Sequence, residues 1–122
     1  MKLHQAVAAG INTFTGYGDD YVAVNGARRE KSLIVVPDRI LDWDVAGFDA
    51  LRAEDFRIFS TLDVDIVLLG TGMRQRFPHP QLTAALARDG IGVEVMDLQA
   101  ACRTYNILVA EERKVAAALL FG

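Results

Sequence analysis

A glycine-rich loop with two arginines is the stretch of this sequence whose residue types best suit ligand binding. Gly70, Thr71 and Gly72 end an apolar run, and Arg74 and Arg76 follow closely. Glycine adopts backbone conformations closed to other residues, so amides of this loop could face an anion, to which the arginines would add charge. The functional interpretation is a pocket for a small anionic ligand. The alternative is that the glycines only allow a turn and the arginines are solvated.

Three side chains of a later helix are grouped with this loop. The helix follows the next predicted strand, and the carboxyl ends of neighbouring parallel strands open at the same edge of a sheet. We therefore expect its first turns to face the loop, with hydrogen-bonded scaffolding as the alternative role. The candidate ligand-binding residues are Gly70, Thr71, Gly72, Arg74, Arg76, Arg103, Tyr105 and Asn106.

No residue pattern in the chain specifies a reaction. The loop lacks the spacing of a P-loop or of GxGxxG, and neither HExxH nor GxSxG occurs. Asp42 and Asp44 flank Trp43, and Asp63 and Asp65 precede an apolar run. Paired carboxylates can share acid–base chemistry, but alternating acids beside a strand are usually its solvated ends. We predict no catalytic residue.

The cysteine and the histidines give no metal-binding spacing. Cys102, His4 and His79 are far apart in the sequence, so we predict neither a metal nor a cofactor. Cys102 falls between Leu98 and Tyr105 on an apolar helix face, which favours core packing over nucleophilic chemistry. His4 belongs to a terminus that we expect to be frayed, and His79 is placed to cap the following helix.

Trp43 is the candidate for a partner-binding surface. Large aromatic side chains near irregular segments often mark such surfaces. The alternative is that the ring closes over the core as a lid.

A strand–helix–strand unit must position the glycine loop. Residues 66–69 are all apolar, as in a parallel strand buried on both faces. Residues 80–88 predict a helix and residues 91–96 a second strand, which together form a parallel crossover. Asp97 is the expected N-cap of the next helix. The apolar face of that helix comprises Leu98, Ala101, Cys102, Tyr105, Leu108 and Val109.

The first half of the sequence has a different pattern. Residues 11–17 and 21–24 predict a hairpin around a Gly-Asp-Asp turn. Residues 31–36 predict a strand, residues 38–47 an irregular segment, and residues 51–62 a helix. At the other end of the chain, residues 115–121 are ambiguous, because their alanines favour a helix while their continuous apolarity suits a buried strand.

Composition limits the classes of protein to consider. The 122 residues are 52% hydrophobic and 24% charged, which predicts a single globular domain over 1–122, with residues 1–10 frayed. A net charge of −3 argues against general nucleic-acid binding. No apolar run reaches the roughly 18 residues of a membrane span. The one cysteine cannot form an internal disulfide, and we expect a cytoplasmic protein.

An ordered set of short strings carries a family resemblance. The strings are LLGTG at 68–72, RFP at 76–78, GIGVEVMD at 90–97 and AACRTYNILVAE at 100–111. With them, the chain resembles the domain-of-unknown-function family that includes mitochondrial complex I assembly factor 3 and many bacterial and archaeal proteins. The resemblance covers roughly residues 11–120, and the string SLIV at 32–35 and Trp43 fit it in the first half.

The resemblance implies a fold. It is a compact three-layer α/β domain with a mixed central sheet, an additional N-terminal β layer and flanking helices. Residues 114–120 would then form a strand, which we expect to be antiparallel to its neighbours. Val64, Leu98 and Glu112 depart from the family pattern, and Glu112 stands where glycine is frequent. A left-handed backbone there would prefer glycine.

The resemblance also implies a role in assembly rather than catalysis. We expect a non-catalytic protein-interaction or complex-assembly module with a protein partner, and possible homo-oligomers. The alternative is a small anionic-ligand binder or enzyme that uses the glycine-rich loop at 70–78. A plain scaffold is a third interpretation, with no positive signature.

Overall fold

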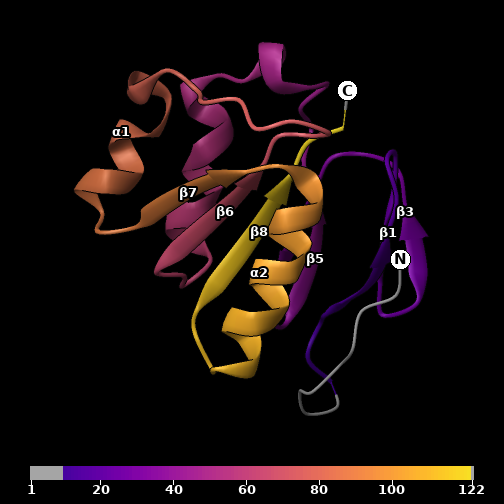
Figure 1. The fold of residues 1–122 in the computed structure, drawn as a ribbon. Coiled ribbons are helices and arrows are strands. Elements are labelled where there is room, and N and C mark those ends of the chain that lie inside the picture. Colours follow the sequence, from indigo (N-terminus) through magenta and orange to yellow (C-terminus); the bar gives the residue numbers. More distant parts are fainter. Residues whose placement is uncertain (1–9, 122) are drawn as a thin grey trace.

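The computed structural model describes residues 10–121, in which strands β1 to β5 come first and helices and further strands follow (Figure 1). Residues 1–9, for which a frayed terminus is expected, lie outside the described residues, and so does His4. The strands are β1 (Phe14–Tyr17), β2 (Val22–Val24), β3 (Ala27–Arg29), β4 (Leu33–Val36), β5 (Arg39–Asp42), β6 (Ile66–Gly70), β7 (Gly92–Met96) and β8 (Val115–Leu119). The helices are η1 (Phe48–Ala50), η2 (Ala53–Thr61), α1 (Pro80–Arg88) and α2 (Leu98–Ala110).

The main sheet is mixed. Its five strands have the order β5-β4-β8-β6-β7, and β1, β2 and β3 form a separate antiparallel sheet. Strands β6 and β7 pair in parallel across the α1 crossover, as the sequence predicts. Residues 115–119 of the C-terminal run form β8 rather than a helix. The expectation that it is antiparallel to its neighbours is half wrong, because β8 is antiparallel to β4 but parallel to β6.

Each face of the main sheet has its own core. Helices η2 and α1 cover one face through Phe56, Phe59 and Leu86. Helix α2 and the β1–β3 sheet cover the other face, and Figure 1 shows this small sheet and α1 on opposite sides of the molecule. Strand β8 is buried throughout, since its alternate residues enter the two cores. The expected three-layer α/β architecture is confirmed.

Local signals explain where the helices begin and end. The Asp97 carboxylate accepts a hydrogen bond from the amide of Ala100 at 2.8 Å, which confirms the predicted N-cap. The His79 ring accepts one from the amide of Gln81 at 3.1 Å and caps α1, also as expected. Glu112 follows the C-cap of α2 with a φ of 62°, so this turn does use a left-handed residue. Glycine would relieve a strain of roughly 1 kcal/mol there.

Two segments of the first half differ from the sequence predictions. Residues 38–47 are not wholly irregular, because residues 39–42 form the edge strand β5, which pairs with β4. The predicted helix at 51–62 is a run of 3₁₀ turns, η2, preceded by η1. Strand β3 follows the Asn25-Gly26 turn and was not predicted, because its exposed residues lack an apolar alternation.

Candidate functional site

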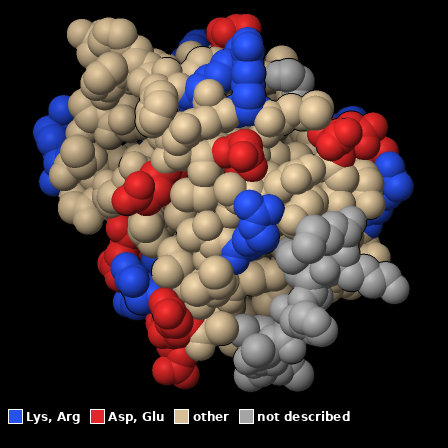
Figure 2. All heavy atoms as spheres, viewed as in Figure 1, with Lys and Arg blue, Asp and Glu red and all other residues tan. Residues whose placement is uncertain are grey.

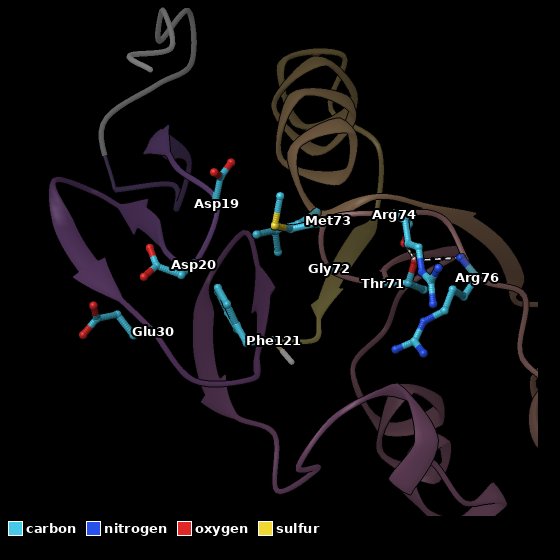
Figure 3. Close-up of a pocket in the computed structure, with 10 residues that line it drawn as sticks. Asp19, Asp20, Glu30, Thr71, Gly72, Met73, Arg74, Arg76 and Phe121 are labelled. Carbon is cyan, nitrogen blue, oxygen red and sulfur yellow. Dashed lines mark hydrogen bonds between the residues drawn. The ribbon is translucent and has the colours of Figure 1, made fainter.

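A cavity of about 650 Å³ lies between the glycine loop and the turn of the β1–β2 hairpin. We call residues 71–79 the β6–α1 loop. The cavity has an acidic wall, consisting of Asp19, Asp20 and Glu30, and an apolar floor, consisting of Met73, Leu98 and Phe121. The other residues that line it are Thr71, Gly72, Arg74 and Arg76. Figure 3 shows the acidic wall on the hairpin side and both arginines on the opposite side, with Met73 and Phe121 between them.

The topology of the main sheet explains why a cavity forms here. Strand β6 continues into α1, which lies on one face, whereas β7 continues into α2 on the other face. When the loops after two neighbouring parallel strands run to opposite faces of the sheet, a crevice opens between them. It lies at the carboxyl ends of the two strands. The loop after β6 and the start of α2 both line the cavity, as the sequence predicts for this sheet edge.

Thr71 fixes the backbone of the β6–α1 loop. Its side chain donates a hydrogen bond to the carbonyl of Arg74 at 2.7 Å and accepts one from the amide of Arg76 at 3.0 Å. Its own amide donates to the carbonyl of Met96, and the amide of Leu98 donates to the carbonyl of Gly72. These hydrogen bonds engage the amides of Thr71 and Arg76 within the protein and hold the loop in place between these two residues.

Gly70 has a packing role at the base of this loop. A Cβ atom added to it would lie 2.8 Å from Cδ2 of Leu119 and 3.1 Å from Cβ of Ala101. Strand β6 therefore needs glycine here so that α2 and β8 can approach it closely. Gly72 has a φ of 89°, which suits glycine for a different reason, its left-handed backbone.

The two arginines of the loop are not equivalent. Arg76 lies over the ring of Phe48 at 4.3 Å and pairs with Asp49 at 3.7 Å, so its charge is directed toward η1. Arg74 is exposed, and within residues 10–121 no ion pair involves it. With three carboxylates on the opposite wall, the cavity does not have the positive character of a simple anion site.

Arg103, Tyr105 and Asn106 do not converge on the loop, and this expectation needs correction. They fasten the N-terminal hairpin to α2. The Asn106 side chain accepts a hydrogen bond from the Phe14 amide at 2.9 Å and donates one to the Phe14 carbonyl at 2.7 Å. Tyr105 donates to the carbonyl of Asn12, and Arg103 donates to the hydroxyl of Tyr17. Helix α2 carries the β1–β3 sheet on this side, so the alternative role as scaffolding describes them.

Trp43 does not provide an exposed partner surface in this structure. Its side chain is only 6% exposed and packs edge to face against Phe56 and Phe59, with both ring-centroid distances at 5.8 Å. The indole nitrogen donates a hydrogen bond to the carbonyl of Asp55 at 3.0 Å. The ring is a lid on the core beneath η2, which agrees with the alternative interpretation.

Cys102 is a packing residue. It is fully buried against the small sheet, and burial raises the pKa of its thiol from 9.0 to about 12, an effect that neighbouring Arg103 opposes only in part. Burial also raises the pKa of Tyr105. Among residues 10–121, no three His, Cys, Asp or Glu side chains lie close enough together to hold a metal ion.

The buried thiol leads to a prediction about alkaline stability. Above pH 9, Cys102 ionises in the unfolded chain but stays protonated in the folded protein, so unfolding releases a proton and is favoured by rising pH. We expect the free energy of unfolding to fall by up to about 1.4 kcal/mol per pH unit from this group. Urea titrations at pH 8, 9 and 10 should show a shallower decline for Cys102→Ala than for the wild type. Parallel declines would contradict the prediction.

The β6–α1 loop also presents exposed apolar side chains that are not among the candidate residues predicted from the sequence. Met73 is 73% exposed and Phe77 is 72% exposed. The available signal was the placement of large apolar residues among the glycines, arginines and prolines of a loop. Elsewhere among the described residues, the exposed large apolar side chains are those of Ile58, which is 37% exposed, and Ile107, which is 58% exposed.

Charged side chains of both signs are scattered over the face seen in Figure 2. No broad patch of one sign covers that face, and the net charge of the chain is −3. Within residues 10–121, no helix combines the length and apolar character needed to cross a bilayer.

Comparisons with known proteins identify similar chains. A family model described as "Protein of unknown function (DUF498/DUF598)" matches residues 14–120. A Danio rerio protein named NADH dehydrogenase [ubiquinone] 1 alpha subcomplex assembly factor 3 is 35% identical over 98% of this chain and 70% of its own length. The chain spans between 60% and 70% of the length of the relatives of that name in Xenopus tropicalis, Danio rerio and Bos taurus.

Solved structures agree with the fold described above. A crystal structure from Bordetella parapertussis is 39% identical, with a TM-score of 0.88 over 95% of this chain and 100% of the other. A solution structure from Bordetella pertussis, titled a Mth938-like domain, is 35% identical with a TM-score of 0.82. It covers 98% of this chain and 92% of that domain.

Proposed function

The chain belongs to the DUF498/DUF598 family of proteins of unknown function, and on this basis we propose that it is a protein-interaction module that assists complex assembly. Its curated relatives carry the name of an assembly factor for NADH dehydrogenase. The partner that we propose is a subunit of a multisubunit NADH dehydrogenase before its incorporation into the complex. We propose a binding role without a catalytic step.

The observation that carries this proposal is the exposed pair Met73 and Phe77 on a fixed loop. Aromatic and methionine side chains are over-represented at protein interfaces, and a few such anchors supply most of the binding energy. Thr71 holds the backbone of this loop through the three hydrogen bonds described above. A loop that is already ordered loses little entropy when a partner docks on it.

The proposal can be tested with two matched double variants in the full chain. Met73→Ser/Phe77→Ser removes the anchors, while Ile58→Ser/Ile107→Ser removes exposed apolar side chains of η2 and α2. Cross-linking with mass spectrometry would identify NADH dehydrogenase subunits bound to each protein. Native gels of a strain that lacks the chain would measure the assembled complex after complementation.

We expect the Met73→Ser/Phe77→Ser protein to bind its subunit at least about tenfold more weakly and to restore less assembled complex. The Ile58→Ser/Ile107→Ser protein should behave like the wild type. Equal capture of the subunit by both variants would place the interface elsewhere. Normal levels of assembled complex in the strain without the chain would overturn the assembly role.

A further inference from the structure

We propose that the cavity beside the β6–α1 loop holds an extended segment of the partner protein with a defined polarity. A basic residue of this segment faces the acidic wall, an apolar residue lies on the apolar floor, and an acidic residue faces Arg74. The inference rests on the proposed function, because it names the chemistry that the partner offers at the surface beside Met73 and Phe77.

The character of the cavity favours a protein segment over a small ligand. Its volume of about 650 Å³ could hold either occupant. However, every side chain of the acidic wall is exposed, as is Arg74, so water competes for each of these charges. A small anion would gain little from one exposed arginine. A segment of a docked protein brings several such contacts together and adds the burial of the apolar floor.

The acidic wall carries more negative charge than its neighbours neutralise. Arg28 lies 4.0 Å from Asp20 and 3.5 Å from Glu30, while it also covers the ring of Tyr21. Within residues 10–121, no ion pair involves Asp19. One guanidinium thus pairs with two of the three carboxylates, which leaves this end of the cavity suited to a lysine or arginine of the partner.

The opposite end carries one available positive charge. Arg74 and Arg76 both line the cavity on its loop side (Figure 3), but Arg76 is engaged by Phe48 and Asp49. Between the two ends, Met73 is exposed and Phe121 is half-buried, so an apolar side chain inserted there would cover apolar surface of both. The charge pattern is therefore bipolar, with an apolar centre.

Both walls are held in place before any partner arrives. The hairpin that carries Asp19 and Asp20 is tied to α2 by the side chains of Arg103, Tyr105 and Asn106. The loop wall is held by Thr71. Because the two walls are fixed before binding, they favour a segment whose charged residues come in one order. Segments with another order would not fit, since the walls do not rearrange.

A display experiment can test the polarity directly. A phage library of random linear decapeptides would be selected in parallel on the full wild-type chain, on Asp19→Lys/Asp20→Lys, and on Glu94→Lys. Glu94 is an exposed acid of β7 outside the cavity, so its variant controls for a charge reversal elsewhere on the surface. The recovered peptides would be synthesised, and their affinities for the three proteins measured by fluorescence anisotropy.

We expect the wild type and Glu94→Lys to select peptides with a basic residue and an acidic residue on either side of an apolar one. These peptides should bind Asp19→Lys/Asp20→Lys at least about tenfold more weakly. No enrichment on the wild type, or enrichment that is the same on all three proteins, would overturn the inference. If that occurs while Met73 and Phe77 remain necessary for capture of the subunit, the proposed function stands without this groove. If peptides are selected as expected but no subunit is captured, the proposed function fails and the occupant of the groove is not the partner proposed here, so the inference fails with it.

Discussion

Replacing Trp43 by alanine is expected to lower the free energy of unfolding by about 3–5 kcal/mol, as for other buried aromatic residues. The indole fills the space between β5 and η2, where it contacts Phe56 and Phe59 edge to face. Helix η2 consists of 3₁₀ turns, whose hydrogen bonds have poorer geometry than those of an α-helix. We infer that packing against Trp43, more than backbone hydrogen bonding, keeps η2 on the sheet.

Urea titrations followed by far-ultraviolet circular dichroism would measure this loss. Trp43→Phe is the informative control, since it keeps an aromatic ring but removes the hydrogen bond from the indole to the carbonyl of Asp55. We expect it to cost less than the alanine variant, at about 1–3 kcal/mol. A loss below about 1 kcal/mol for Trp43→Ala would mean that the ring is not part of the core. Trp43 would then again be the candidate for a partner-binding surface.

The second half of the fold could be predicted because its signals are local. The apolar run of β6, the helix bounds of α1 and the Asp97 cap of α2 each depend on neighbouring residues. The hairpin of β1 and β2 is also local, since its turn residues lie between the two strands. Strand β5 escaped prediction because it is an edge strand, whose exposed and half-buried residues carry no clear alternation.

The site could be predicted only in part, because some of its contacts join residues that are far apart in the sequence. The sequence places the glycine loop and the start of α2 at one sheet edge, and the cavity is there. It does not show that the hairpin turn supplies the facing wall, because that contact depends on how α2 carries the small sheet. Nor does it show that Arg76 is held by Phe48 and Asp49, which lie far away in the sequence. The glycines and arginines of the loop therefore predict an anion site. The structure shows that carboxylates also line the cavity, so it carries charges of both signs.

Asn106 helps to fix the small sheet on α2, which is the contact that the sequence does not show. Its replacement by alanine is the second variant for which we expect a large effect. Its amide bonds both the N–H and the C=O of Phe14, so the truncation leaves two partly buried backbone groups without partners. At about 1–3 kcal/mol for each group, we expect the free energy of unfolding to fall by roughly 2–6 kcal/mol. Ile107→Ala, an exposed neighbour on the same helix, should change it by less than about 0.5 kcal/mol.

Hydrogen exchange can separate a local effect of Asn106→Ala from a general loss of stability. Because the lost bonds join β1 to α2, amides of the β1–β2 hairpin should exchange faster relative to those of β6 and β8, which lie inside the main sheet. A uniform acceleration across both sheets would contradict this view of Asn106 as the fastener of the hairpin. The distinction matters for binding, since the hairpin turn carries Asp19 and Asp20. A loosened hairpin would deprive the cavity of its preorganised acidic wall while the anchors of the β6–α1 loop stay in place.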